Sequence, residues 1–407
     1  MIKKLLANVG AYKRASLMTP VYVAGEVALD VIMPLIMAMM IDQGIEKGHA
    51  GVILRYGGLL FLCSLLALVL GTLGGRTAAI ASAGFARNLR HTLFSKIQDF
   101  SFSNIDRFSS SSLITRMTTD VTNVQNAYQM IIRILVRSPL ILVFSLIMVS
   151  TISPELMLVY LVVLPILAIG LALVIRFAHP LFLKVFRIYD RLNNVVQENL
   201  QGIRVVKSYV REEQQEELFD EVSNDVYRNF TLAQRIVSFN MPLMQFSIYS
   251  CMLLLSWFGA QLIVEHSSLT TGELVSMFNY TMQILMSLMM MSMAFVQILI
   301  ARTSAQRVVE VLDEESDLKN PASPLTEVKD GSIVFENACF SYANDQTKLA
   351  LENVNLRIES GEVIGIIGGT GSAKSTLVQL IPRLYDVIDG RVLVGGQDVR
   401  AYDLAAL

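Results

Sequence analysis

The stretch "GGTGSAKST", residues 368–376, combines glycines, a lysine and hydroxyl groups at the spacing that holds phosphate. Glycines let successive backbone N–H groups turn toward phosphate oxygens, and the lysine brings a positive charge to the terminal phosphates. The pattern therefore predicts a phosphate-binding loop. The expected binding residues are Gly368, Gly369, Thr370, Gly371, Ser372, Ala373, Lys374, Ser375 and Thr376.

Three side chains of this loop have separate expected roles. Lys374 would reach the β- and γ-phosphates, the hydroxyl of Ser375 would ligate Mg²⁺, and Thr376 would lie near the α-phosphate. Ala373 departs from the pattern G-x-x-x-x-G-K-[ST], which has glycine at that position. If the position requires a positive φ, the Cβ costs about 1–2 kcal/mol. A glycine-rich turn without a ligand is the alternative interpretation.

The sequence around the loop predicts the beginning of an α/β domain over 331–407. Short runs typical of strands are "IVFENACFSY", "LALENVNLRI", "VIGII" at Val363–Ile367 and "RVLV" at 391–394. A helix is expected from Lys374 through Leu384, directly after the loop. A strand, a phosphate loop and a helix in this order favour phosphate binding over a simple turn.

The rest of the chain is unusually apolar. Hydrophobic residues make up 53% of the 407 residues and charged residues only 17%, which is outside the range of ordinary soluble domains. A helix that spans a membrane needs about 20 mostly apolar residues. A six-helix transmembrane domain is therefore predicted over 15–305, followed by a polar linker at 306–330. Its expected spans are 17–41, 56–83, 134–152, 156–178, 241–264 and 273–301.

Basic residues are concentrated in three places along the chain. They gather in the N-terminal segment 1–14 and in the long polar segments 84–133 and 179–239, whereas the short alternate connections hold only Lys47 and Arg55. By the positive-inside rule, both chain ends and both long segments are cytoplasmic in a multi-pass protein of the cell membrane. Apolar positions at helical spacing indicate that the spans continue as helices into these segments. Segment 1–14 predicts a short amphipathic helix on the cytoplasmic membrane surface.

Three stretches resemble the ATP-binding cassette (ABC) exporters, and in particular half-transporters of the bacterial multidrug type. "RFSSSSLITRMTTDVTNVQ" at 107–125 and "LNNVVQENLQGIRVVKSYVREEQQEELFDE" at 192–221 resemble the two cytoplasmic loops of that family. "IESGEVIGIIGGTGSAKSTLVQLIPRLYD" at 358–386 resembles its phosphate-loop region and is the most specific of the three. The resemblance covers essentially the whole chain. It implies a type-1 transmembrane domain fused to a P-loop nucleotide-binding domain.

The resemblance implies ATP and Mg²⁺ as cofactors, and ATP-driven export of amphipathic or drug-like compounds across the cytoplasmic membrane. Tyr342 matches the aromatic residue that stacks on adenine in this family, with an ordinary strand tyrosine as the alternative. Short helices at the loop tips, near 109–116 and 200–209, would transmit the nucleotide state to the spans. Six spans and one cassette make half a transporter. The expected partners are therefore a second half, identical or related, the bilayer and a small hydrophobic substrate, but no nucleic acid.

The family's glutamine loop, LSGGQ-type signature, catalytic glutamate and switch histidine have no counterpart in these 407 residues. Phosphoryl transfer needs a group that orients the attacking water as well as a phosphate cradle. We therefore expect no catalytic residue in this chain by itself, and we interpret the sequence as a longer reading frame truncated after the P-loop region. The alternative function is a membrane subunit that binds nucleotide or a partner and never hydrolyses ATP.

Glu26 and Asp30 lie four residues apart in the first expected span and so share one helical face. Carboxylates at membrane depth are costly and usually face a cavity or a partner. The two residues are candidates for a counter-charge to cationic substrates. The other interpretation is a polar face met by Arg76 of the second span or by neighbouring backbone.

Methionines are concentrated in the sixth expected span, in the run "MQILMSLMMMSMAF". Methionine adapts its shape to many apolar ligands and also fills gaps between helices. Met286 and Met290 are therefore candidates for the substrate path, with core packing as the alternative. The cysteines, at positions 63, 251 and 339, lie in separate segments and indicate neither a disulfide framework nor a metal site.

Overall fold

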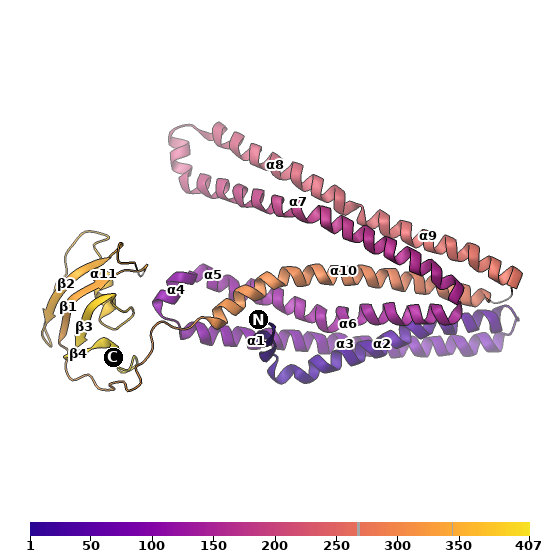
Figure 1. Cartoon of the computed structure of the whole chain (residues 1–407), viewed down its shortest axis with the longest axis horizontal. Helices are drawn as coiled ribbons and strands as arrows, with labels where there is room; N and C mark the ends of the chain where they lie inside the picture. Colours follow the sequence, from indigo (N-terminus) through magenta and orange to yellow (C-terminus); the bar gives the residue numbers. More distant parts are fainter. Residues whose placement is uncertain (267–268, 344) are drawn as a thin grey trace. The chain divides into compact units, whose positions relative to one another are not determined.

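Long helices make up most of the chain (Figure 1). The computed structural model describes residues 1–266, 269–343 and 345–407. Within these residues, six helical segments are long and apolar enough to cross a membrane. They run Gly10–Ile45, Ala50–Gln98, Ser110–Ile152, Pro154–Ser208, Glu212–Glu265 and Thr271–Asp313. Each expected span lies within one of these segments in the expected order, so the prediction of an all-α membrane domain is confirmed.

The helices continue well beyond the apolar stretches. They are α1 (Ile2–Ala7), α2 (Lys13–Met40), α3 (Ala50–Gln98), α4 (Phe102–Phe108), α5 (Ser110–Thr115), α6 (Val121–Ile152), α7 (Pro154–Ser208), α8 (Glu212–Ser238), α9 (Asn240–Gln261) and α10 (Thr271–Asp313). A helix satisfies its own backbone hydrogen bonds, so it can pass from hydrocarbon into water without breaking. The predicted helical extensions of the spans are thereby confirmed.

Residue contacts divide the chain into two compact units. The membrane unit comprises Leu17–Ala78 and Met130–Phe295, and the sheet unit comprises Met1–Ser16, Ala79–Gln129 and Val296–Leu407. Helices α2, α3, α6 and α10 each contribute residues to both units. The two units are therefore joined by continuous helices.

Buried tyrosines tie the helices of the membrane unit together. The phenol of Tyr160 on α7 donates a hydrogen bond to the Met277 carbonyl of α10 at 3.0 Å. The phenol of Tyr280 on α10 donates to the Val31 carbonyl of α2 at 2.8 Å. Both rings are fully buried in one apolar cluster. In hydrocarbon a polar group needs an internal partner, so these bonds fix the positions of α2 and α7 against α10.

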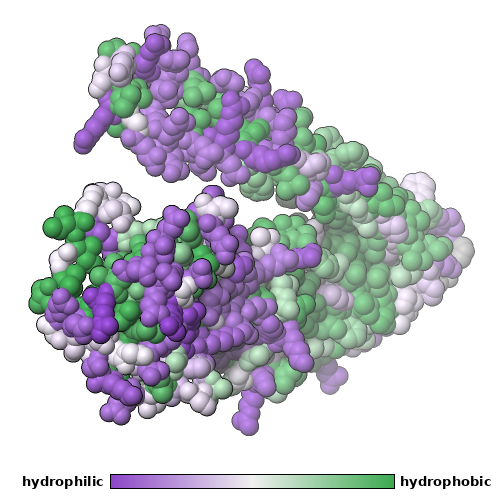
Figure 2. Space-filling view, turned by 60° about the vertical axis from the view of Figure 1, so that its left-hand side comes forward, coloured by the Kyte–Doolittle hydropathy of each residue, from purple (hydrophilic) through white to green (hydrophobic). Residues whose placement is uncertain are grey.

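Helices α7, α8 and α9 form a long hairpin within the membrane unit, with its turn between Ser208 and Glu212. Figure 2 shows hydrophilic residues over much of the half of this hairpin nearest the turn, and hydrophobic residues over the other half. Val222 and Ala233 of α8 are buried, as are Ala178 and Val185 of α7. The hairpin is thus a packed pair of helices along both its polar and its apolar parts.

The helical part of the sheet unit has its own apolar core. Leu5 of α1, Phe85 of α3, Phe108 of α4 and Val308 of α10 are buried together in it. Leu5 is the buried residue of α1, whereas Ile2 and Leu6 are 66% and 49% exposed. The N-terminal segment is therefore helical, with one side packed on the protein and the other free.

A four-stranded antiparallel sheet forms the rest of the sheet unit. Its strands are β1 (Ile333–Phe340), β2 (Leu351–Ile358), β3 (Asp389–Val394) and β4 (Gln397–Asp398), in the order β2-β1-β3-β4. Ile333 of β1 pairs with Ile358 of β2 and with Val394 of β3, which sets the register on both sides. The short helix α11 (Lys374–Leu380) packs on this sheet through Leu380. Three of the four expected strands are therefore present.

The fourth expected strand, Val363–Ile367, is not a strand in the structure. It joins none of the described strands, and Val363 and Ile367 are 95% and 98% exposed. A strand exists only when a neighbouring strand accepts and donates its backbone hydrogen bonds. No described strand pairs with this run, so its apolar composition alone does not make it a strand.

The predicted helix from Lys374 through Leu384 is too long. In the structure α11 ends at Leu380. Pro382 has no N–H to continue the helical hydrogen bonds, and Arg383 adopts a positive φ of 55°. The helix therefore ends four residues before its predicted end, and the turn at Pro382 and Arg383 places the residues that follow it.

Candidate functional site

The predicted phosphate-binding loop contains two left-handed backbone positions. Gly371 has a φ of 86° and Ala373 a φ of 57°. Ala373 directly precedes α11 and makes no side-chain cap hydrogen bond. Ala373 therefore has the positive φ at which a Cβ is strained.

Lys374 lies folded back onto the loop that precedes it. Its Nζ donates hydrogen bonds to the carbonyl oxygens of Gly368 and Gly369, at 2.9 and 2.6 Å, and to Ser372 Oγ at 3.2 Å. All three acceptors are neutral, and within the described part of the chain no carboxylate pairs with this ammonium group. An uncompensated positive charge on a glycine-rich loop fits a polyphosphate. The exposed Ser375 next to it is free to meet a metal ion.

Tyr342 lies beside the start of α11. Its hydroxyl is 2.8 Å from Thr376 Oγ1, and its side chain is 53% exposed. The exposed ring leaves a face open next to the phosphate loop, where an adenine base could stack. Stacking on adenine stays a prediction, and so does the position of Thr376 near an α-phosphate.

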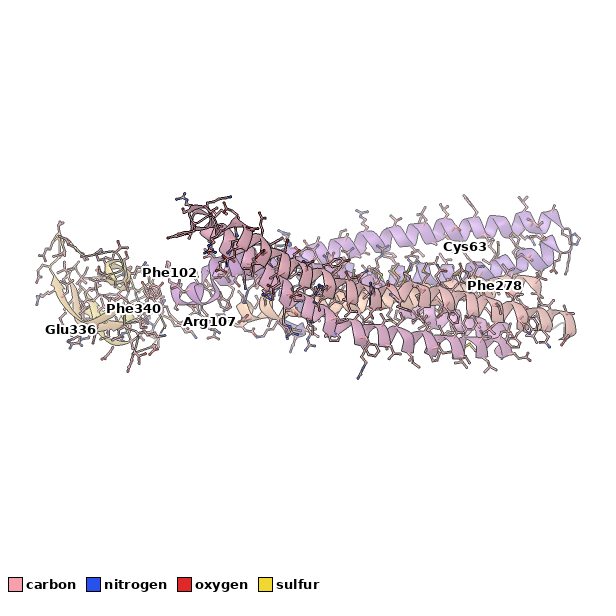
Figure 3. The ribbon with its side chains drawn as sticks, turned by 90° about the horizontal axis from the view of Figure 1, so that it is seen from above. Cys63, Phe102, Arg107, Phe278, Glu336 and Phe340 are labelled. Atoms are coloured by element: carbon pink, nitrogen blue, oxygen red, sulfur yellow. The ribbon has the colours of Figure 1, made fainter. Side chains whose placement is uncertain are left out.

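Tyr385 connects this region to the helical part of the sheet unit. Its ring is 5.3 Å from the rings of both Phe340 and Tyr342, measured between centroids. On its other side it lies 6.0 Å from the ring of Phe102 on α4. Phe102 and Phe340 lie close together in Figure 3, on the helical and the sheet side of this cluster. Tyr385 is thus the central ring between the strand β1 and the helix α4.

A hydrogen bond strengthens the same connection. The Tyr385 hydroxyl donates to a carboxylate oxygen of Asp106 on α4 at 2.8 Å. Burial and the neighbouring Asp106 carboxylate raise the pKa of Tyr385, so the phenol keeps the proton that it donates. Arg383 donates to both carboxylate oxygens of Asp386, at 2.9 and 3.1 Å, and so holds the turn that presents Tyr385.

Helix α4 is also fastened to the end of α10. Asn104 donates a hydrogen bond to Glu314 Oε1 at 2.9 Å, and Arg107 pairs with the same carboxylate at 2.9 Å. Ser103 donates to Asp317 at 2.9 Å. Since Glu314 directly follows α10, one short helix bridges Tyr385 and the last turn of the sixth apolar helix.

The two loop tips differ from the arrangement that the resemblance implied. A short helix, α5, does lie within 109–116, but Tyr385 contacts Phe102 and Asp106 of α4 instead. The second expected tip helix, near 200–209, is the end of α7 and not a separate helix. Sequence reasoning missed Tyr385 as a functional residue, although it lies in the quoted phosphate-loop stretch, because its partner Asp106 is 279 residues away.

In the membrane unit, Glu26 and Asp30 share a partner that the sequence did not suggest. Arg137 of α6 donates to Glu26 Oε1 at 2.5 Å and to Asp30 Oδ2 at 2.8 Å. Arg76, which was the alternative partner expected from the sequence, is exposed. Glu26 Oε2 is buried and makes no hydrogen bond within the described residues. The two carboxyl groups and one guanidinium form a partly buried cluster with two acidic groups for one basic group.

The methionines of α10 are divided between two faces. Met286 and Met290 are 52% and 48% exposed, and Met282 and Met293 are exposed beside them at helical spacing. Met289 instead packs against the buried cluster around Leu167. Core packing therefore does not explain Met286 and Met290, whose face is open to lipid, to substrate or to another chain.

Both regions of the chain match known families. Residues 18–289 match the ABC transporter transmembrane region, and residues 351–407 match the ABC transporter family. Uncharacterized ABC transporter ATP-binding proteins of Bacillus subtilis and Mycobacterium tuberculosis are each 32% identical, over 98% and 99% of this chain and 69% of their own lengths. The ATP-dependent lipid A-core flippase of Pseudoalteromonas translucida is 25% identical over 100% of this chain and 69% of its own length.

Proposed function

The chain belongs to the ABC transporter family, and from this premise we propose that it is one half of an exporter driven by ATP hydrolysis. Family membership implies a multi-pass membrane protein that binds ATP, hydrolyses it in the complete transporter and associates with another half. The proposed cargo is an amphipathic or drug-like compound, moved out of the cytoplasm across the cell membrane. The second half is either an identical or a related chain.

The observation that carries this proposal is the connection through Tyr385. It links the residues around the phosphate loop to α4 by ring contacts and a hydrogen bond, and α4 in turn holds Glu314 at the end of α10. Helix α10 runs unbroken from Thr271 to Asp313. A displacement at the nucleotide would therefore be passed to a membrane helix through packed, directional contacts.

The residues of the loop have complementary proposed roles in holding ATP with Mg²⁺. Bound ATP supplies the phosphoryl group whose transfer to water drives the cycle. Lys374 would exchange its loop carbonyls for phosphate oxygens, Ser375 would ligate Mg²⁺, and Tyr342 would stack on the adenine. The backbone of Gly369 and Gly371 would cradle phosphate, since no atom lies within 4 Å of either position where a Cβ would be.

For the substrate path we propose Glu26, Asp30, Met286 and Met290. The cluster of two carboxylates with Arg137 carries a net negative charge, which suits a cationic compound that competes with the arginine for the carboxylates. The exposed methionines offer an adaptable apolar surface. One relative is an ATP-dependent lipid A-core flippase. Because a lipid is an amphipathic molecule, this likeness supports an amphipathic cargo, but it does not indicate the charge of that cargo.

The proposed topology has both termini and the loops 84–133 and 179–239 in the cytoplasm. Its support is the distribution of basic residues, which are abundant in the extensions of α3, α6, α7 and α8. The proposed domains are 1–14, 15–305, a linker at 306–330, and a nucleotide-binding part at 331–407.

The test is transport by the complete transporter in inside-out proteoliposomes, with a fluorescent cationic dye in the external buffer. We expect ATP–Mg²⁺ to drive dye into the vesicles and the dye to stimulate ATP hydrolysis. A Lys374→Ala variant reconstituted at equal density is the control and should lose both activities. ATP binding without hydrolysis or dye movement would contradict an exporter and support the non-hydrolysing membrane subunit.

A further inference from the structure

A groove with a volume of about 320 Å³ lies between α7 and the junction of α8 and α9. This volume is within the range of about 300–1,000 Å³ that small-ligand sites occupy. Its walls are apolar except at one place, where Arg235 of α8 contributes. The residues that define it include Gly170, Leu173, Phe177, Arg235, Phe239 and Leu243.

The groove lies beside a close contact between the two helices. Deeper in the membrane unit, Leu167 of α7 and Met244 of α9 are buried in one cluster. At Gly170 the helices are so close that a Cβ would lie 2.5 Å from Leu243 Cδ2. Beyond this contact the side chains of Phe177 and Phe239 are 58% and 68% exposed. The groove therefore has an exposed aromatic side chain on each of its two walls, at the end of the apolar spans.

The hairpin around this groove carries positive charge only. Residues 171–189 of α7 and 226–243 of α8 and α9 contain five cations and no Asp or Glu. None of the five has an acidic partner among the residues that the structure describes. The first ion pair further along the hairpin, Arg191 with Glu221 at 3.7 Å, lies toward the turn. The cations are Arg176, Lys184, Arg187, Arg228 and Arg235.

Two other grooves of the membrane unit lack this combination. One, also of about 320 Å³, is lined by Leu142, Tyr160 and Pro165 among others, with no charged residue. Another, near the turn of the hairpin, is lined by Lys207, but that lysine is paired with Glu212 at 3.0 Å. Among these grooves, only the one at Arg235 joins an apolar wall to a cation without an acidic partner.

We propose that this groove binds an anionic phospholipid, with an acyl chain along Leu173, Phe177 and Phe239 and the phosphate at Arg235. The cations stand at the end of the apolar spans, where lipid headgroups lie. Basic pockets between membrane helices on the cytoplasmic side are suited to anionic headgroups. Since the proposed topology puts this end of the hairpin in the cytoplasm, the lipid comes from the cytoplasmic leaflet.

The experiment uses the whole chain in nanodiscs and a tryptophan placed in the groove. Phe239→Trp is combined with Trp257→Phe, which removes the single native tryptophan. The bilayer is phosphatidylcholine with a minor fraction of phosphatidylglycerol, and either lipid carries brominated acyl chains that quench fluorescence on contact. We expect phosphatidylglycerol to be preferred about fivefold at this position, the effect of one basic residue near an anionic headgroup.

The proposal requires that the preference depend on Arg235. Arg235→Gln should remove most of it, whereas Arg228→Gln, which deletes a cation of the same hairpin outside the groove lining, should leave it unchanged. Equal quenching by both lipids with Arg235 present, or the same preference without it, would refute the site. Quenching by neither lipid would show that a second copy or another helix covers the groove. Leu173→Trp on the opposite wall repeats the measurement if the Phe239 variant does not fold.

Discussion

The hydroxyl of Tyr385 donates a hydrogen bond of 2.8 Å to the carboxylate of Asp106. The two residues lie 279 positions apart in the chain, one just after the phosphate-loop helix and the other in the short helix α4. Tyr385 also contacts the ring of Tyr342, whose hydroxyl is within hydrogen-bond distance of Thr376. This relationship makes Tyr385 the residue through which the nucleotide region reaches the helices.

In the complete transporter, loss of this hydrogen bond should uncouple ATP hydrolysis from transport more than it weakens ATP binding. We expect Tyr385→Phe to keep the ring contacts but to lose the hydrogen bond to Asp106, which is worth about 1 kcal/mol. This loss corresponds to about a fivefold change in the equilibrium between the connected and the separated arrangement of Tyr385 and α4. The measurement is dye transport per ATP hydrolysed, beside nucleotide affinity. Tyr189→Phe, an exposed tyrosine of the hairpin, is the matched control. Equal loss in both variants, or a loss of ATP affinity alone, would contradict a coupling role.

The same bond has a defined dependence on pH. The pKa of Tyr385 is raised in the folded protein by burial and by Asp106, relative to about 10 in an unfolded chain. Its contribution to stability is therefore complete below about pH 10 and is lost as the pH rises through the folded pKa. The difference in unfolding free energy between the wild type and Tyr385→Phe should be constant from neutral pH up to that point. A difference that already shrinks between neutral pH and pH 9 would show that the phenol is not the donor.

Ala373 should weaken nucleotide binding without abolishing it. Its φ of 57° implies a strain of about 1–2 kcal/mol, so Ala373→Gly should tighten ATP–Mg²⁺ binding by roughly five- to thirty-fold. Lys374→Ala should weaken binding more than the alanine does, because it removes the charge that faces the terminal phosphates. A titration of the three proteins with a fluorescent ATP analogue measures both effects. Equal affinity of the wild type and the glycine variant would mean that the loop tolerates the Cβ.

Removing the intramembrane carboxylates should affect cationic substrates most. Glu26→Gln with Asp30→Asn deletes the negative charges that pair with Arg137, so efflux of cationic compounds should fall more than efflux of neutral ones of similar size. Efflux of the two dye classes from cells that express equal amounts of protein is the measurement. Equal loss for both classes, together with poor expression, would assign the cluster to structure. Arg137→Gln is a useful comparison, since it leaves two unpaired carboxylates and should lower expression further.

Both ends of the chain should face the cytoplasm. In a variant without native cysteines, a cysteine at Lys47, in the connection between α2 and α3, should react with an impermeant maleimide added to intact cells. A cysteine at Ser110, at the start of α5, should react only after lysis. Ser267, in the connection that precedes α10, would serve equally as an outside position but lies outside the described residues. Labelling in the reverse pattern would overturn the topology and the roles proposed for both loops.

The sequence by itself determined the features whose physics is local. Six apolar stretches long enough to span a bilayer became six long helices, because a helix forms its hydrogen bonds within its own segment. The left-handed backbone at Ala373 could likewise be anticipated from the glycine missing in "GGTGSAKST", whereas phosphate binding by this loop stays a prediction. The continuation of α3 and α7 beyond their apolar parts followed from helical periodicity.

Tertiary structure decided everything that needed a partner far along the chain. The run Val363–Ile367 has the composition of a strand, but strand pairing depends on another segment, and no described strand pairs with it. Arg137 rather than Arg76 meets Glu26, over a separation of 111 residues, because helix packing and not sequence order chooses between two arginines. In the same way Tyr385 gains its role only where the folded chain brings it to Asp106, since a hydrogen bond requires geometry that residue spacing does not specify.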